Sequence, residues 1–294
     1  MTQPVPQPDP AQRPQRPAEL EDWLNARLYH PLSWRLAQRL APTPITPDMV
    51  SVAGAGAIVL AAFAYAQLAW PWGVAVGLAL HMSWHVLDGA DGDLARITGR
   101  SSPHGELVDG ICDYVGHIAL YVTMGFIAAA QIGGWGWALM WAAGASRVVQ
   151  AAHYEGARRQ YQFAAYGTGW MASEAPVTTT SGRRHPFVAY YLWLTGWIVP
   201  HGPALTAAVQ NPARREAVRD AIWAQGGAWL GAMTLLSANY RTLAVSAAML
   251  AGRPPLYFLF EVVVLGGVLA VSLGRVRRAF GAVLAQATPS STLR

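Results

Sequence analysis

Apolar residues form long runs along the chain, and short polar turns separate these runs. An α-helix needs about 20 predominantly apolar residues to cross the hydrocarbon core of a bilayer, and runs of this length recur. The pattern therefore predicts an all-α integral membrane protein with six transmembrane helices. Their expected ranges are 46–69, 71–98, 103–132, 135–161, 223–250 and 255–273.

Cap residues mark several of the expected helix ends. Thr46-Pro47-Asp48 supplies a hydroxyl cap, a proline at the first helical position and an acid in the first turn. Ser102-Pro103 begins the third span in the same way, and Gly133-Gly134 separates the third span from the fourth.

The segments outside the spans differ in composition. Residues 1–18 are rich in Pro and Gln and poor in apolar residues, which predicts a disordered tail. Residues 19–41 predict an amphipathic juxtamembrane helix that lies in the membrane interface, and an ordinary surface helix is the alternative. The apolar side of this helix consists of Leu20, Trp23, Leu24, Leu28, Leu32 and Leu36.

The membrane domain is expected at residues 42–281, and a flexible tail is expected at 282–294. Residues 167–222 interrupt the series of spans and are interpreted as an insertion that adds a helical segment between the fourth and fifth spans. Within it, residues 186–200 are apolar but short for a crossing, so they are interpreted as interfacial or re-entrant.

Composition agrees with a membrane protein. Hydrophobic residues make up 53% of the 294 residues and charged residues only 13%, which excludes an ordinary soluble protein. The net charge is +5 and all 21 basic residues are Arg. No basic stretch is interleaved with exposed aromatic residues, so nucleic acid is not an expected partner. Cys112 is the only cysteine, which excludes an intrachain disulfide.

Arginine placement predicts the orientation in the membrane. Arginines gather in alternate loops, whereas the turns at 69–72 and 132–136 nearly lack them. By the positive-inside rule, both termini and the Asp-rich segment 88–113 are cytoplasmic. The predicted location is the inner (cell) membrane of a bacterium, with membrane lipid around the spans. The arginines counted are Arg96, Arg100, Arg158, Arg159, Arg183, Arg184, Arg275, Arg277 and Arg278.

Four aspartates lie close to or within bilayer depth. Asp88 and Asp91 share a face at the end of the second span, and Asp109 and Asp113 share one at the start of the third. The two helices must lie side by side because the turn between them is short, so the carboxylates converge. Left unpaired in the bilayer, they would cost about 10–14 kcal/mol. Two divalent cations are the expected compensation, and oxygen-only ligands favour Mg²⁺ or Mn²⁺.

Small residues and one arginine accompany these acids. Gly92, Ala95 and Gly105 have little bulk and let a ligand approach the helix backbone. Arg96 offers a positive fork to a phosphate. Together with the metal-binding acids, these residues predict a pyrophosphate site suited to phosphoryl transfer.

The spacing D88-x2-D91-G92-x2-A95-R96-x8-G105-x3-D109-x3-D113 resembles, at every fixed position, the signature of the CDP-alcohol phosphotransferase (CDP-alcohol phosphatidyltransferase) family. The resemblance implies a six-helix membrane fold, a homodimer, a cytoplasm-facing cavity and two bound metal ions. It weakens beyond about residue 166.

The resemblance also implies roles for individual residues. Asp88, Asp91 and Asp109 would ligate metal, and Asp113 would ligate metal and act as the base that takes the proton of the acceptor hydroxyl. The CDP group would be held by Asp91, Gly92, Ala95, Arg96 and Gly105.

Other polar residues lie near the motif or on later spans. His81, His85 and His117 extend the motif faces and are expected to be buried or cavity-lining groups rather than ligands, whereas Asp93 and Glu106 are expected to be solvated. Arg241 and Glu261 are expected either to form a buried pair or to line an acceptor pocket. The full set of acceptor-binding candidates is Arg147, Gln150, Tyr154, Arg158 and Arg241.

The sequence leaves several substrates open. The favoured reaction uses CDP-diacylglycerol and a polyol or phosphorylated polyol, such as inositol, inositol phosphate or glycerol phosphate, and makes a phospholipid with release of CMP. Transfer from CDP-choline or CDP-ethanolamine to diacylglycerol, and from CDP-inositol to inositol phosphate, are alternatives. An intramembrane prenyltransferase is a further alternative, but its pattern of acidic motifs does not include the small residues and the arginine that are found here at Gly92, Ala95, Arg96 and Gly105. A divalent-cation transporter would need polar residues across the bilayer, and here the acids cluster at one end.

Overall fold

The computed structural model describes residues 17–167, 186–199, 201–225, 228–231 and 233–287. All regular structure in these ranges is helical, and they contain no strand. The expected tail at 1–18 lies outside them except for its last two residues, as do residues 168–185 of the expected insertion and the end of the C-terminal tail. The chain divides into two units, Met1–Thr123 and Met124–Arg294.

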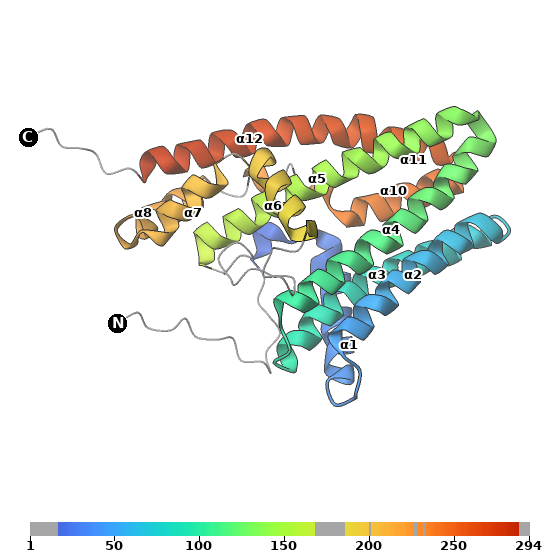
Figure 1. Ribbon diagram of the computed structural model, residues 1–294, viewed down its shortest axis with the longest axis horizontal. Coiled ribbons are helices and arrows are strands. Elements are labelled where there is room, and N and C mark those ends of the chain that lie inside the picture. Colours follow the sequence, from blue (N-terminus) through green and yellow to red (C-terminus); the bar gives the residue numbers. More distant parts are fainter. Residues whose placement is uncertain (1–16, 168–185, 200, 226–227, 232, 288–294) are drawn as a thin grey trace, which may run out of the picture. The chain divides into compact units, whose positions relative to one another are not determined.

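The first unit contains α1 (His30–Leu40), α2 (Pro47–Gln67), α3 (Trp72–Ile97) and most of α4 (Pro103–Ile132) (Figure 1). The expected helix starts are confirmed. The Thr46 hydroxyl accepts from the Met49 backbone N–H at 3.3 Å, and the Ser102 hydroxyl accepts from Gly105 at 3.1 Å. Each cap satisfies a backbone donor that has no partner within its helix.

Close backbone packing joins the helices of this unit. A Cβ on Gly77 of α3 would lie only 2.5 Å from the Tyr65 ring of α2, and a Cβ on Gly116 of α4 would lie 2.9 Å from Ile58 of α2. Only glycine permits these approaches without displacing a neighbour. These close approaches hold α3 and α4 against α2.

Helix α1 and the turn before it pack on α3 with only part of the expected apolar side. Tyr29, Ser33 and Ala37 are buried, and the Ser33 hydroxyl donates to the Val86 carbonyl of α3 at 2.8 Å. Trp23, from the expected apolar side, is 68% exposed. Leu36, also from the expected apolar side, is partly buried against the core cluster of Ala37, Val50, Ala90 and Leu94. The expected apolar side is therefore divided between protein contact and exposure, and the position of this helix in a membrane interface stays a prediction.

This segment also begins later than expected. A π-helical turn, η2 (Asn25–Tyr29), precedes α1, and the Asp22 carboxylate accepts from the Asn25 backbone N–H at 3.0 Å. Pro31 explains the π-turn, because it has no N–H to donate and its ring clashes with the carbonyl four residues earlier. Burial and the nearby Asp22 raise the pKa of the Tyr29 hydroxyl to about 12, so it stays neutral at physiological pH.

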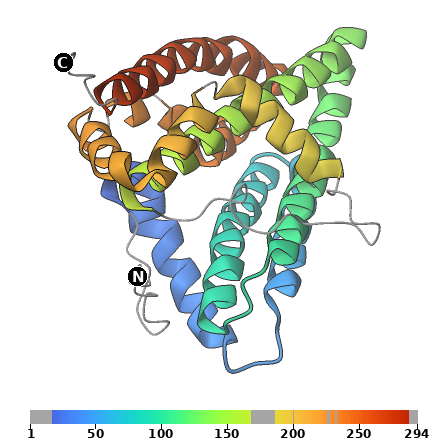
Figure 2. The same ribbon diagram turned by 60° about the vertical axis from the view of Figure 1, so that its left-hand side comes forward.

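The second unit is built around one long helix, α5 (Gly134–Tyr166), which packs against α8 and α12 (Figure 2). Gly133 precedes it with a φ of 63°, a conformation that favours glycine. This confirms the expected break at Gly133-Gly134. The other helices of the unit are α6 (Pro186–Ile198), α7 (Gly202–Gln210), α8 (Pro212–Ala224), α9 (Ala228–Gly231), α10 (Ala238–Leu250), α11 (Pro254–Leu259) and α12 (Leu265–Gln286).

Three helices among the described residues are long and apolar enough to cross a membrane: Pro47–Gln67, Pro103–Ile132 and Pro254–Gln286. Helices α3 and α5 have 26 and 33 residues, but polar side chains interrupt their apolar runs.

The expected fifth and sixth spans differ from the observed helices. The range 223–250 is divided among several helices, and α10 has only 13 residues because Ser237, which precedes it, has an extended backbone. The last helix continues to Gln286, well past the expected end at 273, so residues 282–286 of the predicted flexible tail are helical.

Candidate active site

Two neighbouring helices bring the acidic residues of the motif together. Carboxylate oxygens of Asp88, Asp109 and Asp113 lie within 4.8 Å of one another. The carboxyl groups of Asp88 and Asp113 are in contact, and so are those of Asp91 and Asp109. The turn from Thr98 to Ser102 sets α3 against α4 in the register that makes this convergence possible.

A third helix contributes to the same cluster. The Ser51 hydroxyl of α2 donates to Asp91 Oδ2 at 2.6 Å, and the Gly92 backbone N–H donates to Asp91 Oδ1 at 2.5 Å. Asp91 is thus oriented from both sides and buried. Ser51 was not among the expected site residues, although it lies one turn after the Pro47 start of α2.

Arg96 is held by an acid that the sequence analysis placed in solvent. Asp93 is only 2% exposed, and its carboxylate accepts from the Arg96 guanidinium at 2.5 Å. The expectation that Asp93 is solvated is therefore wrong. Asp93 lies off the helix face that Asp88 and Asp91 share, but it forms an i,i+3 ion pair with Arg96. Glu106, by contrast, is exposed as expected.

The small residues leave space beside the acids. The Arg96 guanidinium lies 3.8 Å from where a Cβ on Gly92 would be, so the arginine folds back over the glycine. A Cβ on Gly105 would lie 3.7 Å from the Asp48 carboxylate, which places the first turns of α2 and α4 side by side. Ala95 lies on the same helix as Gly92 and is half-buried.

The acidic cluster brings several carboxylates close together. Two carboxylates separated by 4.8 Å repel each other by about 3 kcal/mol at an effective dielectric constant near 20. Arg96 pairs with Asp93, and a hydroxyl, a backbone amide and an indole donate hydrogen bonds to Asp91 and Asp113. An all-oxygen set of this charge fits one or two hard divalent cations.

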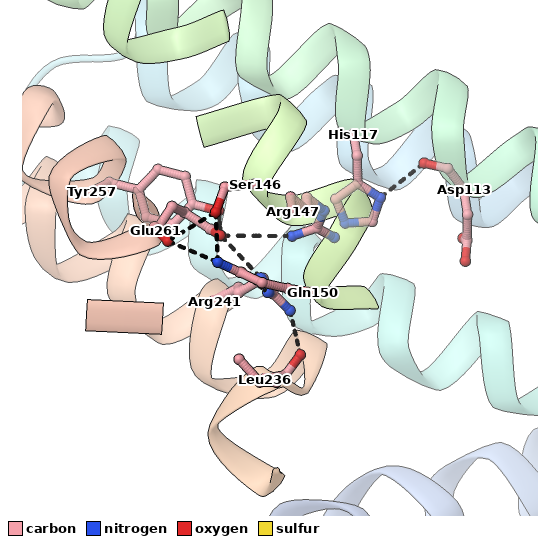
Figure 3. A network of polar contacts seen from close by, with 9 residues as sticks. All are labelled: Asp113, His117, Ser146, Arg147, Gln150, Leu236, Arg241, Tyr257 and Glu261. Atoms are coloured by element: carbon pink, nitrogen blue, oxygen red, sulfur yellow. Dashed lines mark hydrogen bonds and ion pairs between the residues drawn. The ribbon is translucent and has the colours of Figure 1, made fainter. Parts of the chain in front are cut away.

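An aromatic group that the sequence analysis did not select also contacts the acids. The Trp84 indole Nε1 donates to Asp113 Oδ1 at 2.8 Å. His117 packs edge-on to this indole, and its Nδ1 donates to the Asp113 backbone carbonyl at 2.8 Å (Figure 3). His81, His85 and His117 are buried, as expected. The available signal for Trp84 was its position four residues before Asp88.

The second unit contains a separate polar cluster around Arg241 (Figure 3). Arg241 Nε donates to Glu261 at 2.9 Å, its terminal nitrogens donate to Gln150 at 2.5 Å and to the Leu236 carbonyl, and Tyr257 donates to Glu261 at 2.8 Å. Glu261 lies in the π-helical turn η4 (Phe260–Val264), and its carbonyl accepts from Gln150 at 2.9 Å. Arg241 and Glu261 were expected either to form a buried pair or to line an acceptor pocket, and in the structure they form a buried pair.

The remaining acceptor-binding candidates lie on α5 and are only partly buried. Arg147 approaches Glu261 at 4.0 Å, and Glu155 accepts from both Arg158 and Arg159. Tyr154 is half-buried on the same helix. These residues belong to a different unit from the aspartates, and their role in acceptor binding stays a prediction.

Comparison with known proteins gives one match. A family model described as CDP-alcohol phosphatidyltransferase matches residues 44–211, more than half of the chain. The match includes every aspartate of the Asp-rich segment and continues past residue 166, where the resemblance of the sequence weakened. No curated protein matches the sequence.

Proposed function

The chain belongs to the CDP-alcohol phosphatidyltransferase family and is a transferase of substituted phosphate groups, and we propose that it uses a CDP-linked donor, most simply CDP-diacylglycerol, in a metal-dependent reaction. The acceptor is a polyol or phosphorylated polyol, and the products are a phospholipid and CMP. The observation that supports this most directly is the convergence of the Asp88, Asp109 and Asp113 oxygens within 4.8 Å.

The four aspartates of the motif would hold the ions, Mg²⁺ or Mn²⁺. When bound, two such cations would neutralise the pyrophosphate and polarise the phosphoryl group that is transferred. Ser51 orients Asp91 among these ligands through its hydrogen bond. The donor group would lie over Gly92, Ala95 and Gly105, with the Arg96 guanidinium, steadied by Asp93, against a phosphate.

Asp113 carries the proton transfer in this proposal. It accepts the proton of the acceptor hydroxyl while the hydroxyl oxygen forms a bond to the β-phosphorus of the donor. The bond from this phosphorus to the bridging oxygen breaks, and CMP leaves with the electron pair. Because Gly92 and Gly105 have no side chain, the donor can approach the helix backbone closely enough for an in-line displacement.

The test is CMP release by the purified protein in lipid, with and without Mg²⁺ or Mn²⁺. CDP-diacylglycerol, CDP-choline, CDP-ethanolamine and CDP-inositol would each be paired with a panel of alcohols, phosphorylated polyols and diacylglycerol. We expect CMP only when metal, CDP-diacylglycerol and a polyol-type acceptor are all present. Metal-dependent CMP release from another donor would replace the substrate assignment, and metal flux without CMP would support the transporter alternative.

The proposal includes six membrane crossings, with the Asp-rich segment and both termini in the cytoplasm of a bacterial cell, and a homodimer. The single Cys112 offers a direct test, because a Cys112→Ala background contains no thiol. Cysteines introduced at Arg100 and at Trp70 lie at opposite ends of α3. We expect an impermeant maleimide to label only position 70 in spheroplasts. Labelling of position 100 alone would reverse the orientation.

A further inference from the structure

The indole of Trp84 reaches across from α3 to a carboxylate of α4. Its Nε1 donates to Asp113 Oδ1 at 2.8 Å. Trp84 lies one turn before Asp88, so it shares the helix face that carries the acids, and it is 4% exposed. A buried indole N–H requires an acceptor, and here that acceptor belongs to the acidic cluster.

The surroundings of the indole fix its orientation. His117, one turn after Asp113, packs edge-on against it with ring centroids 4.6 Å apart, and His85 lies on it at 4.4 Å. A Cβ on Gly54 of α2 would come within 3.3 Å of the indole Cδ1, so the glycine leaves the space that the ring occupies. The ring is therefore enclosed by α2, α3 and α4.

The two histidines that pack against the indole are themselves held by further contacts. Tyr29, which precedes α1, stacks on His85 with ring centroids 4.6 Å apart, and the His117 Nδ1 donates to the Asp113 backbone carbonyl at 2.8 Å. The same imidazole thus contacts both the donor indole and the backbone of the acceptor aspartate. Movement of the indole away from Asp113 would disturb several buried contacts.

We propose that Trp84 is a positioning residue, whose N–H sets the rotation of the Asp113 carboxylate for metal binding and for proton acceptance. The proposal rests on the proposed function. A neutral donor suits this task, because it orients the carboxylate without adding a positive charge that would compete with cations for it. An arginine or lysine at position 84 would neutralise the acid instead.

The main experiment compares the wild type with Trp84→Phe, which keeps an aromatic ring but removes the donor. We expect kcat for CMP release to fall about 10- to 100-fold, as is typical when a group that orients a metal ligand is lost. KM for donor and acceptor should change less than about threefold, because Trp84 contacts neither substrate in this proposal. The Kd for Mn²⁺, measured by electron paramagnetic resonance without substrates, should rise about tenfold.

Two further variants distinguish the effect of the indole N–H from the effect of the aromatic ring. Trp84→3-benzothienylalanine replaces the indole N–H by sulfur with nearly the same shape, and it should reproduce both effects of Trp84→Phe. Trp137 packs edge-on to Phe126 in the second unit, so Trp137→Phe is the matched control and should leave kcat and Mn²⁺ affinity unchanged. If Trp84→Phe fails to fold, the benzothienyl variant carries the test.

The outcomes are distinct. Wild-type kcat and Mn²⁺ affinity in the benzothienyl variant would overturn the proposal, since the ring alone would then suffice. Lower thermal stability with unchanged kcat and Mn²⁺ affinity would also overturn it, because Trp84 would be only a packing residue. Absence of CMP release from the wild type with every donor would contradict the proposed function, and the Mn²⁺ titrations would still decide the role of Trp84.

Discussion

The chain contains two polar clusters that differ in the charges they bring together: one is partly buried and made of carboxylates, and the other is buried and made of an ion pair with its hydrogen-bond partners. In the first unit, Asp88, Asp109 and Asp113 place like charges within 4.8 Å of one another. In the second, Arg241 and Glu261 form an ion pair, and Gln150 and Tyr257 satisfy further hydrogen bonds. In the second cluster, opposite charges within the chain are paired with each other. In the proposed function, divalent cations neutralise the first cluster, and this is the difference that we propose between a structural network and a binding site.

The largest expected effect comes from the first cluster. Asp113→Asn keeps the shape of the side chain but removes the base, so we expect CMP release to fall by at least about 10³-fold. Donor binding should be largely retained, as measured by equilibrium binding of radiolabelled CDP-diacylglycerol. Activity equal to the wild type would eliminate Asp113 as the base.

Breaking the second cluster should affect stability instead. Arg241→Ala leaves Glu261, which is 0% exposed, without its main counter-charge, and removal of one partner from a buried pair costs about 3–5 kcal/mol. We expect a large decrease in the thermal unfolding temperature in detergent. The double variant Arg241→Leu with Glu261→Leu should lose much less. An equal loss in both variants would show that packing, rather than charge balance, stabilises this cluster.

Metal should distinguish the two clusters directly. Saturating Mn²⁺ at about 100 times its Kd would stabilise the folded protein by about 2.7 kcal/mol if it binds only the native state. The unfolding temperature should therefore rise with Mn²⁺ and fall with EDTA in the wild type and in Arg241→Ala. The combined Asp88→Asn and Asp109→Asn variant should lose this response. A response that persists in that variant would place the ion elsewhere.

The smallest effect concerns the arginine beside the acids. Asp93→Asn weakens the charge-assisted hydrogen bond that holds Arg96, and such bonds contribute about 1.5–3 kcal/mol. Part of that energy should be lost, so KM for the donor should rise about three- to tenfold with kcat little changed. Glu106→Gln, at an exposed position of α4, is the control. A pure decrease in kcat would argue against phosphate binding by Arg96.

Much of the first unit could be predicted from the sequence because its signals are local. Helix starts at Thr46 and Ser102 depend on the cap and the proline that follow one another in the chain. The convergence of the acids follows from helical spacing and a short turn between α3 and α4.

The contacts that were missed depend on packing between elements or on a local ion pair that was overlooked. The spacing places Trp84 on the helix face of Asp88, but the direction of its indole toward Asp113 also depends on the packing of α3 against α4 and on the space left by Gly54. The burial of Asp93 was missed for a different reason, since its partner is only three residues away.

The second unit was predicted less well. Hydropathy alone suggested one span at 223–250, where the chain instead forms several short helices. Arginine and glutamate at 241 and 261 were recognised as partners from their cost in an apolar run, but their hydrogen bonds with Gln150 and Tyr257 depend on the path of the intervening helices.

The short turn between α3 and α4 has a consequence for how this chain tolerates insertions and deletions. Each added residue inside a helix rotates everything after it by about 100°, so one extra residue between Gly105 and Asp109 would turn the later acids away from those of α3. An extra residue at Gly99–Ser101 lies outside both helices and can be absorbed by the loop. Length variation that preserves the chemistry is therefore expected in the loop and not in the adjoining helical turns.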